Sequence, residues 1–225
     1  MTGLRQLKKQ QVHDAISTAA ITLFLERGFD EVSVAEVAAA AGVSKPTLFK
    51  YFASKEDLVL HRISDHHEES ARVVRHRGQD EDPLTALHRH FLEGLRRRDP
   101  VTGLNDHPTV LAYHRMIFST PGLAARLVHH TTKDEEALAE ALREVTDDLT
   151  ARLVAAQTLA VQRVLARENW ARLTRGESAD EVYPSAVAAA DHAFGLLPRP
   201  GRTERGGAHE RGAAPHGTTP RDAED

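Results

Sequence analysis

At 225 residues, the chain is long enough to bury a substantial core, and its formal net charge is −4. That charge argues against general attraction to nucleic acid, so any DNA contact must come from local clusters of basic residues. The absence of cysteine excludes disulfides, thiolate zinc ligands and cysteine nucleophiles. No run approaches the roughly 18 apolar residues of a membrane span, and the first ten residues lack an apolar signal segment. The sequence therefore predicts a soluble cytoplasmic protein with no membrane contact.

The first predicted helix covers residues 9–27, where apolar side chains recur at helical spacing up to Gly28. Arg5, Lys8 and Lys9 precede it. These three basic residues form an N-terminal arm that either contacts phosphate or is simply solvated.

Residues 33–51 contain two short predicted helices joined by a tight break. Ser33 and Glu36 have the spacing of a capping box, and Gly42 can leave the first helix through a left-handed conformation. Ser44 then caps a second helix with Pro46 in its first turn. This pattern predicts a helix-turn-helix, whose second helix is suited to a DNA major groove. The alternative is a small three-helix core with no role in DNA binding.

The remainder of the chain has helical periodicity throughout, so we predict an all-α fold. Ser54 and Asp57 have capping-box spacing and predict one continuous helix from residue 54 to about residue 77. A long helix from residue 148 to about 175 carries two apolar stripes, which implies burial on two sides. Residues 198–225 are rich in Gly and Pro and predict a disordered tail. The other predicted helices cover about residues 83–95, 109–119, 121–146 and 178–197.

The 14 histidines do not have metal-ligand spacing, since none has a glutamate three residues before it. No metal site and no cofactor are predicted. Histidines do fall on apolar stripes of three helices, either as partly buried imidazoles or as polar groups in a ligand cavity. The nearby aromatic residues are either cavity wall or ordinary core. The candidate ligand-binding residues are His88, Phe91, Tyr113, His114, Ile117, Phe118, His130, Leu153 and Gln157.

The segment at residues 32–58 reads V-S-V-A-E-V-A-A-A-A-G-V-S-K-P-T-L-F-K-Y-F-A-S-K-E-D-L and resembles the DNA-binding domain of the TetR (tetracycline repressor) family of bacterial regulators. The resemblance covers roughly residues 10–60. It implies a DNA-binding helix-turn-helix domain at residues 1–53, with the fourth helix starting there and reaching about residue 70. It also implies a helical-bundle ligand-binding and dimerisation domain at residues 54–197. The implied partners are a double-stranded DNA operator, a second copy bound through the last two helices, and a small-molecule effector.

The resemblance assigns DNA contacts to residues at the start of the first short helix, along the second, and at the start of the fourth helix. These are Ser33, Val34, Ser44, Lys45, Pro46, Thr47, Phe49, Lys50, Tyr51 and Lys55. Three of them depart from the usual family pattern: Val34 replaces a commonly hydroxylated residue, Pro46 replaces Gly or Ala, and Phe49 replaces Tyr. Phe49 has no hydroxyl for phosphate and could instead contact a thymine methyl group.

We therefore hypothesise a dimeric repressor that a small apolar or amphipathic ligand releases from DNA. A transcriptional activator and a ligand-independent regulator are the alternatives within this class. A helical enzyme is the alternative from another class, although the sequence has no nucleophile elbow, phosphate-binding glycine loop or paired-carboxylate motif. A closed core around Phe91, Tyr113 and Ile117 would argue against a ligand.

Overall fold

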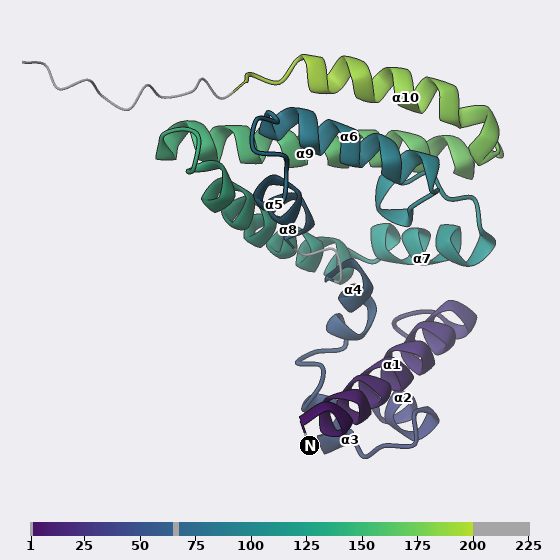
Figure 1. The fold of residues 1–225 in the computed structure, drawn as a ribbon. Helices are drawn as coiled ribbons and strands as arrows, with labels where there is room; N and C mark the ends of the chain where they lie inside the picture. The colour runs from purple at the N-terminus through teal and green to yellow at the C-terminus, as the bar shows by residue number, and fades with distance from the viewer. Residues whose placement is uncertain (1, 65–67, 200–225) are drawn as a thin grey trace, which may run out of the picture.

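The computed structural model describes residues 2–64 and 68–199, and these residues form ten α-helices and one 3-10 helix without a strand. The all-α class expected from the sequence is confirmed. The side chains of residues 2, 4–6, 62–64 and 128–130 lie outside the description, as does the predicted tail from residue 200 onward. Figure 1 shows the small unit of α1–α4 below a larger layered unit. The helices are α1 (Thr2–Arg27), α2 (Val34–Ala40), α3 (Lys45–Phe49), α4 (Asp57–Ser64), α5 (Glu69–Arg75), α6 (Pro83–Arg96), η1 (Pro100–Thr102), α7 (Pro108–Ser119), α8 (Pro121–Leu142), α9 (Asp148–Thr174) and α10 (Ala179–Gly195).

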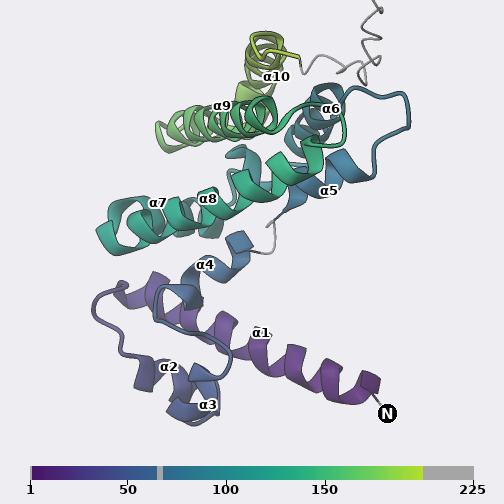
Figure 2. The ribbon, with the colours of Figure 1, turned by 90° about the vertical axis from the view of Figure 1, so that its left-hand side faces the viewer.

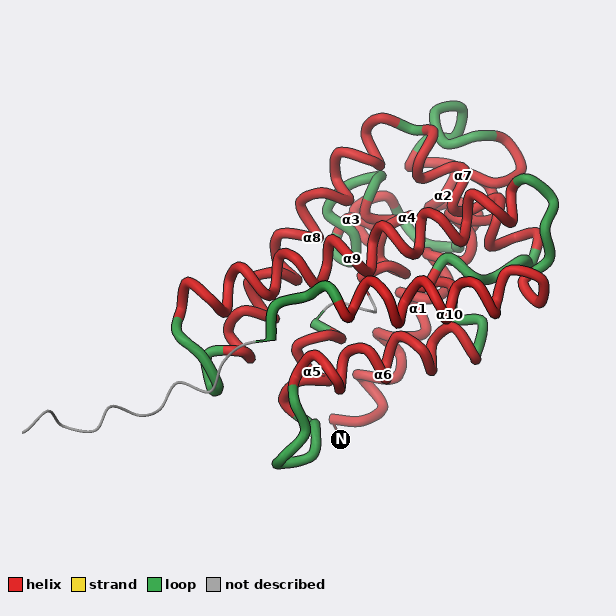
Figure 3. The backbone as a smooth tube through the Cα atoms, turned by 90° about the horizontal axis from the view of Figure 1, so that it is seen from above, coloured by secondary structure: helices red, strands yellow, loops and turns green. Residues whose placement is uncertain are grey.

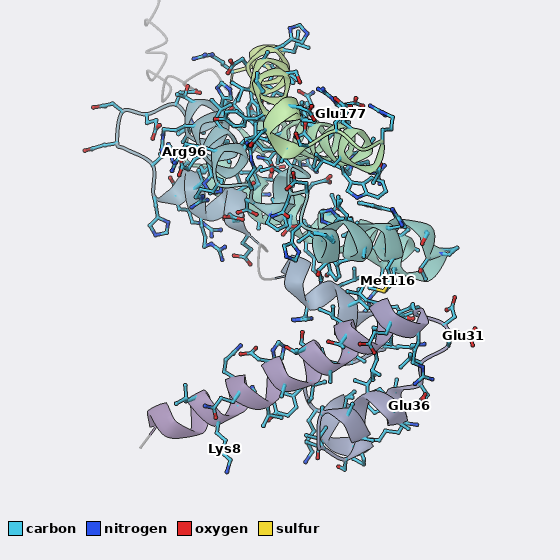
Figure 4. The ribbon with its side chains drawn as sticks, turned by 90° about the vertical axis from the view of Figure 1, so that its right-hand side faces the viewer. Lys8, Glu31, Glu36, Arg96, Met116 and Glu177 are labelled. Atoms are coloured by element: carbon cyan, nitrogen blue, oxygen red, sulfur yellow. The ribbon has the colours of Figure 1, made fainter. Side chains whose placement is uncertain are left out.

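Helix α1 is longer than predicted, because it begins at Thr2 and not near residue 9. Residues 4–11 are Leu, Arg, Gln and Lys, which are good helix formers, so nothing in that stretch ends the helix. Lys8 and Lys9 are therefore exposed helical residues and not part of an extended arm. Figure 4 shows Lys8 projecting from α1 away from the large unit.

The predicted continuous helix at residues 54–77 is wrong, since α4 ends at Ser64 and α5 begins at Glu69. Glu68 has a φ of 57°, in the left-handed region, which interrupts helical geometry. Its backbone N–H donates to Asp134 Oδ1 on α8 at 3.1 Å. The side chain of Asp134, 66 positions away in the sequence, thus supplies a hydrogen-bond partner for a backbone N–H at the break. Figure 2 shows α4 and α5 as separate segments at the junction of the two units.

Only half of the capping box predicted at the start of α4 forms. The Ser54 hydroxyl accepts from the Asp57 N–H at 3.2 Å. The Asp57 carboxylate does not return to the backbone of Ser54 but pairs with Arg126 of α8 at 3.1 Å. The start of α4 is therefore linked to the large unit by an ion pair.

The large unit is built in layers around α9. Helix α9 contacts α8 on one side and α10 on the other, while α10 also packs on α6 and α5 packs on α8. Figure 3, viewed from above, shows α9 between α8 and α10. The apolar core joins all of these helices. Its members include Leu87, Leu95, Leu138, Leu142, Val154, Val182 and Phe194.

Only one of the two apolar stripes predicted on α9 is buried within the chain. Val154 is 1% exposed and Leu165 is 8% exposed. In contrast, Leu149, Leu153 and Val164 are 59%, 51% and 63% exposed. One long face of α9 is thus apolar and uncovered. No helix in the described part of the chain has the length and hydropathy to cross a membrane.

Residues around η1 fix the distance between η1 and α9. Gly103 has a φ of +71°, and a Cβ at this position would lie 1.9 Å from the carbonyl oxygen of Ala166. Asn169, which is 5% exposed, donates its side-chain N–H to the Thr102 carbonyl at 2.9 Å. Because Gly103 has no side chain, its backbone lies directly against the backbone of α9.

We predict that Gly103→Ala destabilises the protein by well over about 1 kcal/mol, because the new Cβ clashes with backbone and an alanine is strained at positive φ. Thermal unfolding followed by circular dichroism measures the effect. Gly122→Ala is the matched control, since a Cβ at Gly122 meets nothing within 4 Å. The control should be neutral or slightly stabilising. Equal midpoints for the two variants would contradict the proposed close packing.

Candidate nucleic-acid interface and ligand cavity

Helix α2 begins at a complete capping box. The Ser33 hydroxyl accepts from the Glu36 N–H at 3.3 Å, and the Glu36 carboxylate accepts from the Ser33 N–H at 2.8 Å. Arg27, at the end of α1, pairs with the same carboxylate at 2.8 Å. The hydrogen bonds from Ser33, followed by the contact with Arg27, lower the pKa of Glu36 to about 2. Figure 4 shows Glu36 on α2 close to the end of α1. This network fixes the orientation of α2 relative to the end of α1.

The turn between α2 and α3 forms as the sequence suggests. Gly42 has a φ of 66°, which ends α2. The Ser44 hydroxyl accepts from the Thr47 N–H at 3.2 Å and caps α3. Leu48 is fully buried and holds α3 against α1 and α2. Helix α3 has only five residues, so this single anchor leaves Lys45, Pro46 and Phe49 facing outward.

The outward side of α3 combines positive charge with an aromatic ring. Lys45, Pro46 and Lys50 are exposed, and Phe49 is 44% exposed. Neither Lys45 nor Lys50 has an acidic partner within the described residues. A basic helix with an exposed ring has the chemistry to contact phosphates and base edges in a groove.

The other predicted DNA-contact residues also have structural contacts. Val34 and Tyr51 are half-buried and pack against the core of the small unit. The Lys55 ammonium lies 4.4 Å from the ring centroid of Phe29 and 5.6 Å from that of Phe24. Lys55 is therefore held by cation–π contacts in this structure.

Helix α4 joins the small unit to α7 and α8. The Tyr113 hydroxyl donates to the Val59 carbonyl at 2.7 Å. Ile117 and Leu123, both fully buried, belong to the same apolar cluster as Leu58 and Val59. A displacement of α7 would therefore act on α4 directly.

A second set of contacts joins α4 to α1. The Ser17 hydroxyl oxygen, on a residue that is 2% exposed, lies 2.6 Å from His61 Nε2. The ring of His13 stacks on Phe52 with centroids 4.6 Å apart, and His61 meets Phe52 edge-on at 5.5 Å. Helix α4 is therefore held by polar and aromatic contacts as well as by apolar ones.

A cavity of about 660 Å³ lies where α1, α4, α5, α6, η1, α7, α8 and α9 meet. That volume is typical of sites that enclose a drug-sized molecule. A closed core around Phe91, Tyr113 and Ile117 would have argued against a ligand. Instead, all three residues line this cavity. The predicted ligand-binding residues that line it are Phe91, Tyr113, His114, Ile117 and Phe118.

Three predicted ligand-binding residues lie elsewhere. His88 faces α10, where its ring stacks on Phe194 at 4.9 Å and its Nε2 lies 2.9 Å from Asp191 Oδ1. Leu153 and Gln157 are exposed on α9, because the helix is turned so that other residues face the cavity. The side chain of His130 lies outside the described residues.

Several cavity residues were not anticipated from the sequence. Helix α9 contributes Leu159, Gln162, Ala166 and Trp170. Glu69 Oε1 on α5 and His90 Nε2 on α6 lie within hydrogen-bond distance, 3.1 Å apart, in the cavity wall. Ser17 and Ile21 of α1 also line the cavity. The sequence signal that could have pointed to one of these residues is that Trp170 is the single tryptophan of the chain.

Two buried polar atoms of the cavity residues have no hydrogen-bond partner among the described residues: His114 Nδ1 and Trp170 Nε1. Burial lowers the pKa of His114, which favours a neutral imidazole. Buried polar atoms normally have partners, so these two atoms are candidates for ligand contact. In the described residues, no three His, Asp or Glu side chains converge as metal ligands.

Comparison with known proteins supports the two-part arrangement. Residues 16–61 match the family model described as bacterial regulatory proteins, tetR family. The chain is 34% identical over 192 residues to the HTH-type transcriptional regulator TcmR of Streptomyces glaucescens, which covers 82% of this chain and 85% of that protein.

Solved structures share the fold at lower sequence identity. NalD, the secondary repressor of the MexAB-OprM multidrug efflux pump in Pseudomonas aeruginosa, aligns with a TM-score of 0.55 at 20% identity, covering 82% of this chain and 96% of NalD. A TetR-family regulator from Streptomyces coelicolor A3 aligns with a TM-score of 0.51 at 22% identity, covering 83% and 96% of the two chains.

We predict that Ser33→Ala raises the pKa of Glu36 from about 2 toward the ordinary 4.5, because the carboxylate loses a hydrogen bond. Because the folded pKa is depressed, the contribution of this network is complete above pH 4.5 and is lost as the pH falls toward 2. NMR titration of the side-chain carboxyl carbons measures the pKa of Glu36 in the wild type and in the variant. Glu181, in the equivalent capping box of α10, is the internal control and should not change. An unchanged Glu36 titration would contradict the assigned cause.

Proposed function

Because this chain belongs to the tetR family of bacterial regulatory proteins, and is therefore a DNA-binding transcriptional regulator and not an enzyme, we propose that it represses transcription as a homodimer on a pseudo-palindromic operator. A small apolar or amphipathic molecule in the cavity releases it from DNA. The observation that carries the proposal is the outward face of α3 and its C-cap, where Lys45, Phe49 and Lys50 have no acidic partners among the described residues. Such a protein works in the cytoplasm and associates with the nucleoid while it is bound to DNA.

In this proposal α3 enters the major groove with its N-terminal end towards the bases. Ser44, Lys45, Pro46 and Thr47 form that end, and Phe49 contributes an apolar contact, for example with a thymine methyl group. The remaining contacts go to the phosphate backbone. We assign these to Ser33, Val34, Lys50, Tyr51 and Lys55. Lys55 would have to leave the ring of Phe29 to reach phosphate, or act through its charge at that distance.

The exposed stripe on α9 supports a dimer. Leu149, Leu153 and Val164 share one face of α9 and are each more than half exposed in the single chain. A large uncovered apolar face on a protein of this size marks an interaction surface. Helices α9 and α10 lie side by side at the edge of the large unit (Figure 3), so two copies meeting there would form a four-helix interface. Two small units would then address two half-sites about one helical turn of DNA apart, or a multiple of it.

Release follows from the position of the cavity. The cavity is lined by α7 and by α1, and α7 holds α4 through the bond between Tyr113 and Val59. A ligand that displaces α7 moves α4, and with it the small unit, which changes the spacing of the two α3 helices. The ligand achieves this only if it binds the two arrangements with different affinity.

The DNA-binding proposal is tested by selecting bound fragments from a pool of genomic DNA with the purified protein. We predict that Lys50→Ala weakens binding of the dimer to the selected operator about tenfold or more at low salt and reduces the salt slope by about two, because each of the two subunits loses one phosphate contact. Fluorescence anisotropy at several salt concentrations measures both quantities. Lys133→Ala, which removes an exposed lysine on α8, is the matched control and should bind normally. Identical isotherms for the two variants would reject the assignment of Lys50.

We predict that Leu153→Glu converts the dimer to a folded monomer, because a charge buried in the interface costs roughly 3 kcal/mol or more. Sedimentation velocity measures the oligomeric state, and operator affinity should fall with it. Leu7→Glu on α1 is the matched control, since Leu7 and Leu153 are 56% and 51% exposed. That variant should remain dimeric. A wild-type protein that sediments as a monomer would refute the dimer proposal outright.

A further inference from the structure

Three aromatic rings form a subsite at one end of the cavity, between α7 and α9. Phe118 lies at its centre, with its ring centroid 6.2 Å from that of His114 and 5.2 Å from that of Trp170. The rings are tilted by 51° and 55° relative to Phe118. We call His114, Phe118 and Trp170 the aromatic subsite. Tilted rings around a common neighbour can receive a further flat ring by edge or offset contact.

Two buried polar atoms of the aromatic subsite lack hydrogen-bond partners among the described residues. Trp170 Nε1 is buried and has no partner in the described chain, and an indole N–H can only donate. Because this nitrogen has almost no accessible surface, a cavity occupant reaches it only when the indole turns, and the partner it then meets must be an acceptor. His114 Nδ1 is also buried without a partner and can donate or accept according to the tautomer. Both residues contact Phe118, so the two unmet polar atoms belong to one subsite.

The surroundings of the subsite favour a neutral ligand. The imidazole of His114 is held neutral by burial. Arg167, one of two arginines among the lining residues, stands with its guanidinium carbon 5.5 Å from the centroid of Phe118 and is itself exposed. Five acidic residues also line the cavity, and one of them, Glu69, lies 3.1 Å from His90 Nε2, so an anionic ligand is disfavoured. Ile117 and Leu159 add apolar wall.

We propose that the aromatic subsite binds a flat aromatic ligand whose ring-attached carbonyl or phenolic oxygen accepts a hydrogen bond from Trp170 Nε1. The proposal rests on the proposed function, because it names the chemical class of the effector. A hydroxyl or second carbonyl on the same ring system meets His114 Nδ1. Saturated chains of the same volume satisfy neither the rings nor the donor.

The test compares two probes of nearly equal shape, 2-acetylnaphthalene and 2-ethylnaphthalene, which differ by a carbonyl group in place of a methylene. Equilibrium dialysis against the full chain gives both dissociation constants. The hydrocarbon is the more apolar probe, so burial alone favours it. We expect the ketone to bind at least as tightly. Trp170 is the single tryptophan, so saturable quenching of its emission by the ketone reports binding at the subsite.

Trp170→Phe keeps a ring but removes the donor. We expect the ratio of the two dissociation constants to shift about tenfold toward the hydrocarbon. Gln157→Ala is the matched control on the same helix, because Gln157 is exposed and does not line the cavity. Its ratio should equal that of the wild type. Circular dichroism establishes that each variant is folded; if Trp170→Phe is not, the wild-type ratio and the quenching decide.

A hydrocarbon that binds tighter than the ketone in the wild type would overturn the proposal. Ketone binding that leaves the Trp170 emission unchanged, or an unaltered ratio in folded Trp170→Phe, would do the same. Operator release is measured separately by anisotropy. A ketone that binds with the expected ratio yet leaves the operator bound supports the subsite and counts against ligand release as the function. If another ligand releases the operator and the protein does not prefer the ketone, ligand release is supported and the aromatic-subsite proposal is contradicted.

Discussion

The contact of α4 with α1 on one side and with α7 and α8 on the other determines how the two parts of this protein are joined. Leu58, Ile117 and Leu123 share one apolar cluster, although they come from both parts of the chain. The core of the DNA-binding unit is therefore completed by helices of the large unit. A flexible linker would allow the two parts to move independently. Here a change in either part alters the packing of the other, which is the physical condition for coupling between sites.

Helix α9 contributes side chains to three parts of the molecule: the apolar core, the cavity wall and an exposed apolar face. Val154 packs into the core, Ala166 and Trp170 border the cavity, and Leu153 is exposed. The rotation of α9 about its axis therefore decides which side chains line the cavity and which form the exposed apolar face. Any ligand that turned α9 would alter both surfaces together.

The DNA-binding unit could be predicted closely because its signals are local: Ser33, Gly42 and Ser44 each specify a cap or a turn from neighbouring residues alone. The cavity could be predicted only in part. Placing Gln157 outside it and Trp170 within it requires the rotation of α9, which depends on packing against α8 and α10. The break at Glu68 likewise depends on Asp134, a residue far away in sequence, so helical propensity alone predicted one long helix.

The backbone contact between Gly103 and Ala166 makes the two sides of the cavity mechanically unequal. On the η1 side, peptide groups touch without an intervening side chain, and protein interiors packed so closely deform little. On the α7 side, the wall consists of side chains such as Phe118 and Tyr113, which can change rotamer or shift with their helix. An occupant larger than the resting cavity would therefore displace the softer wall. The stiff glycine contact on one side thus gives any enlargement of the cavity a direction, toward α7 and the α4 that it contacts.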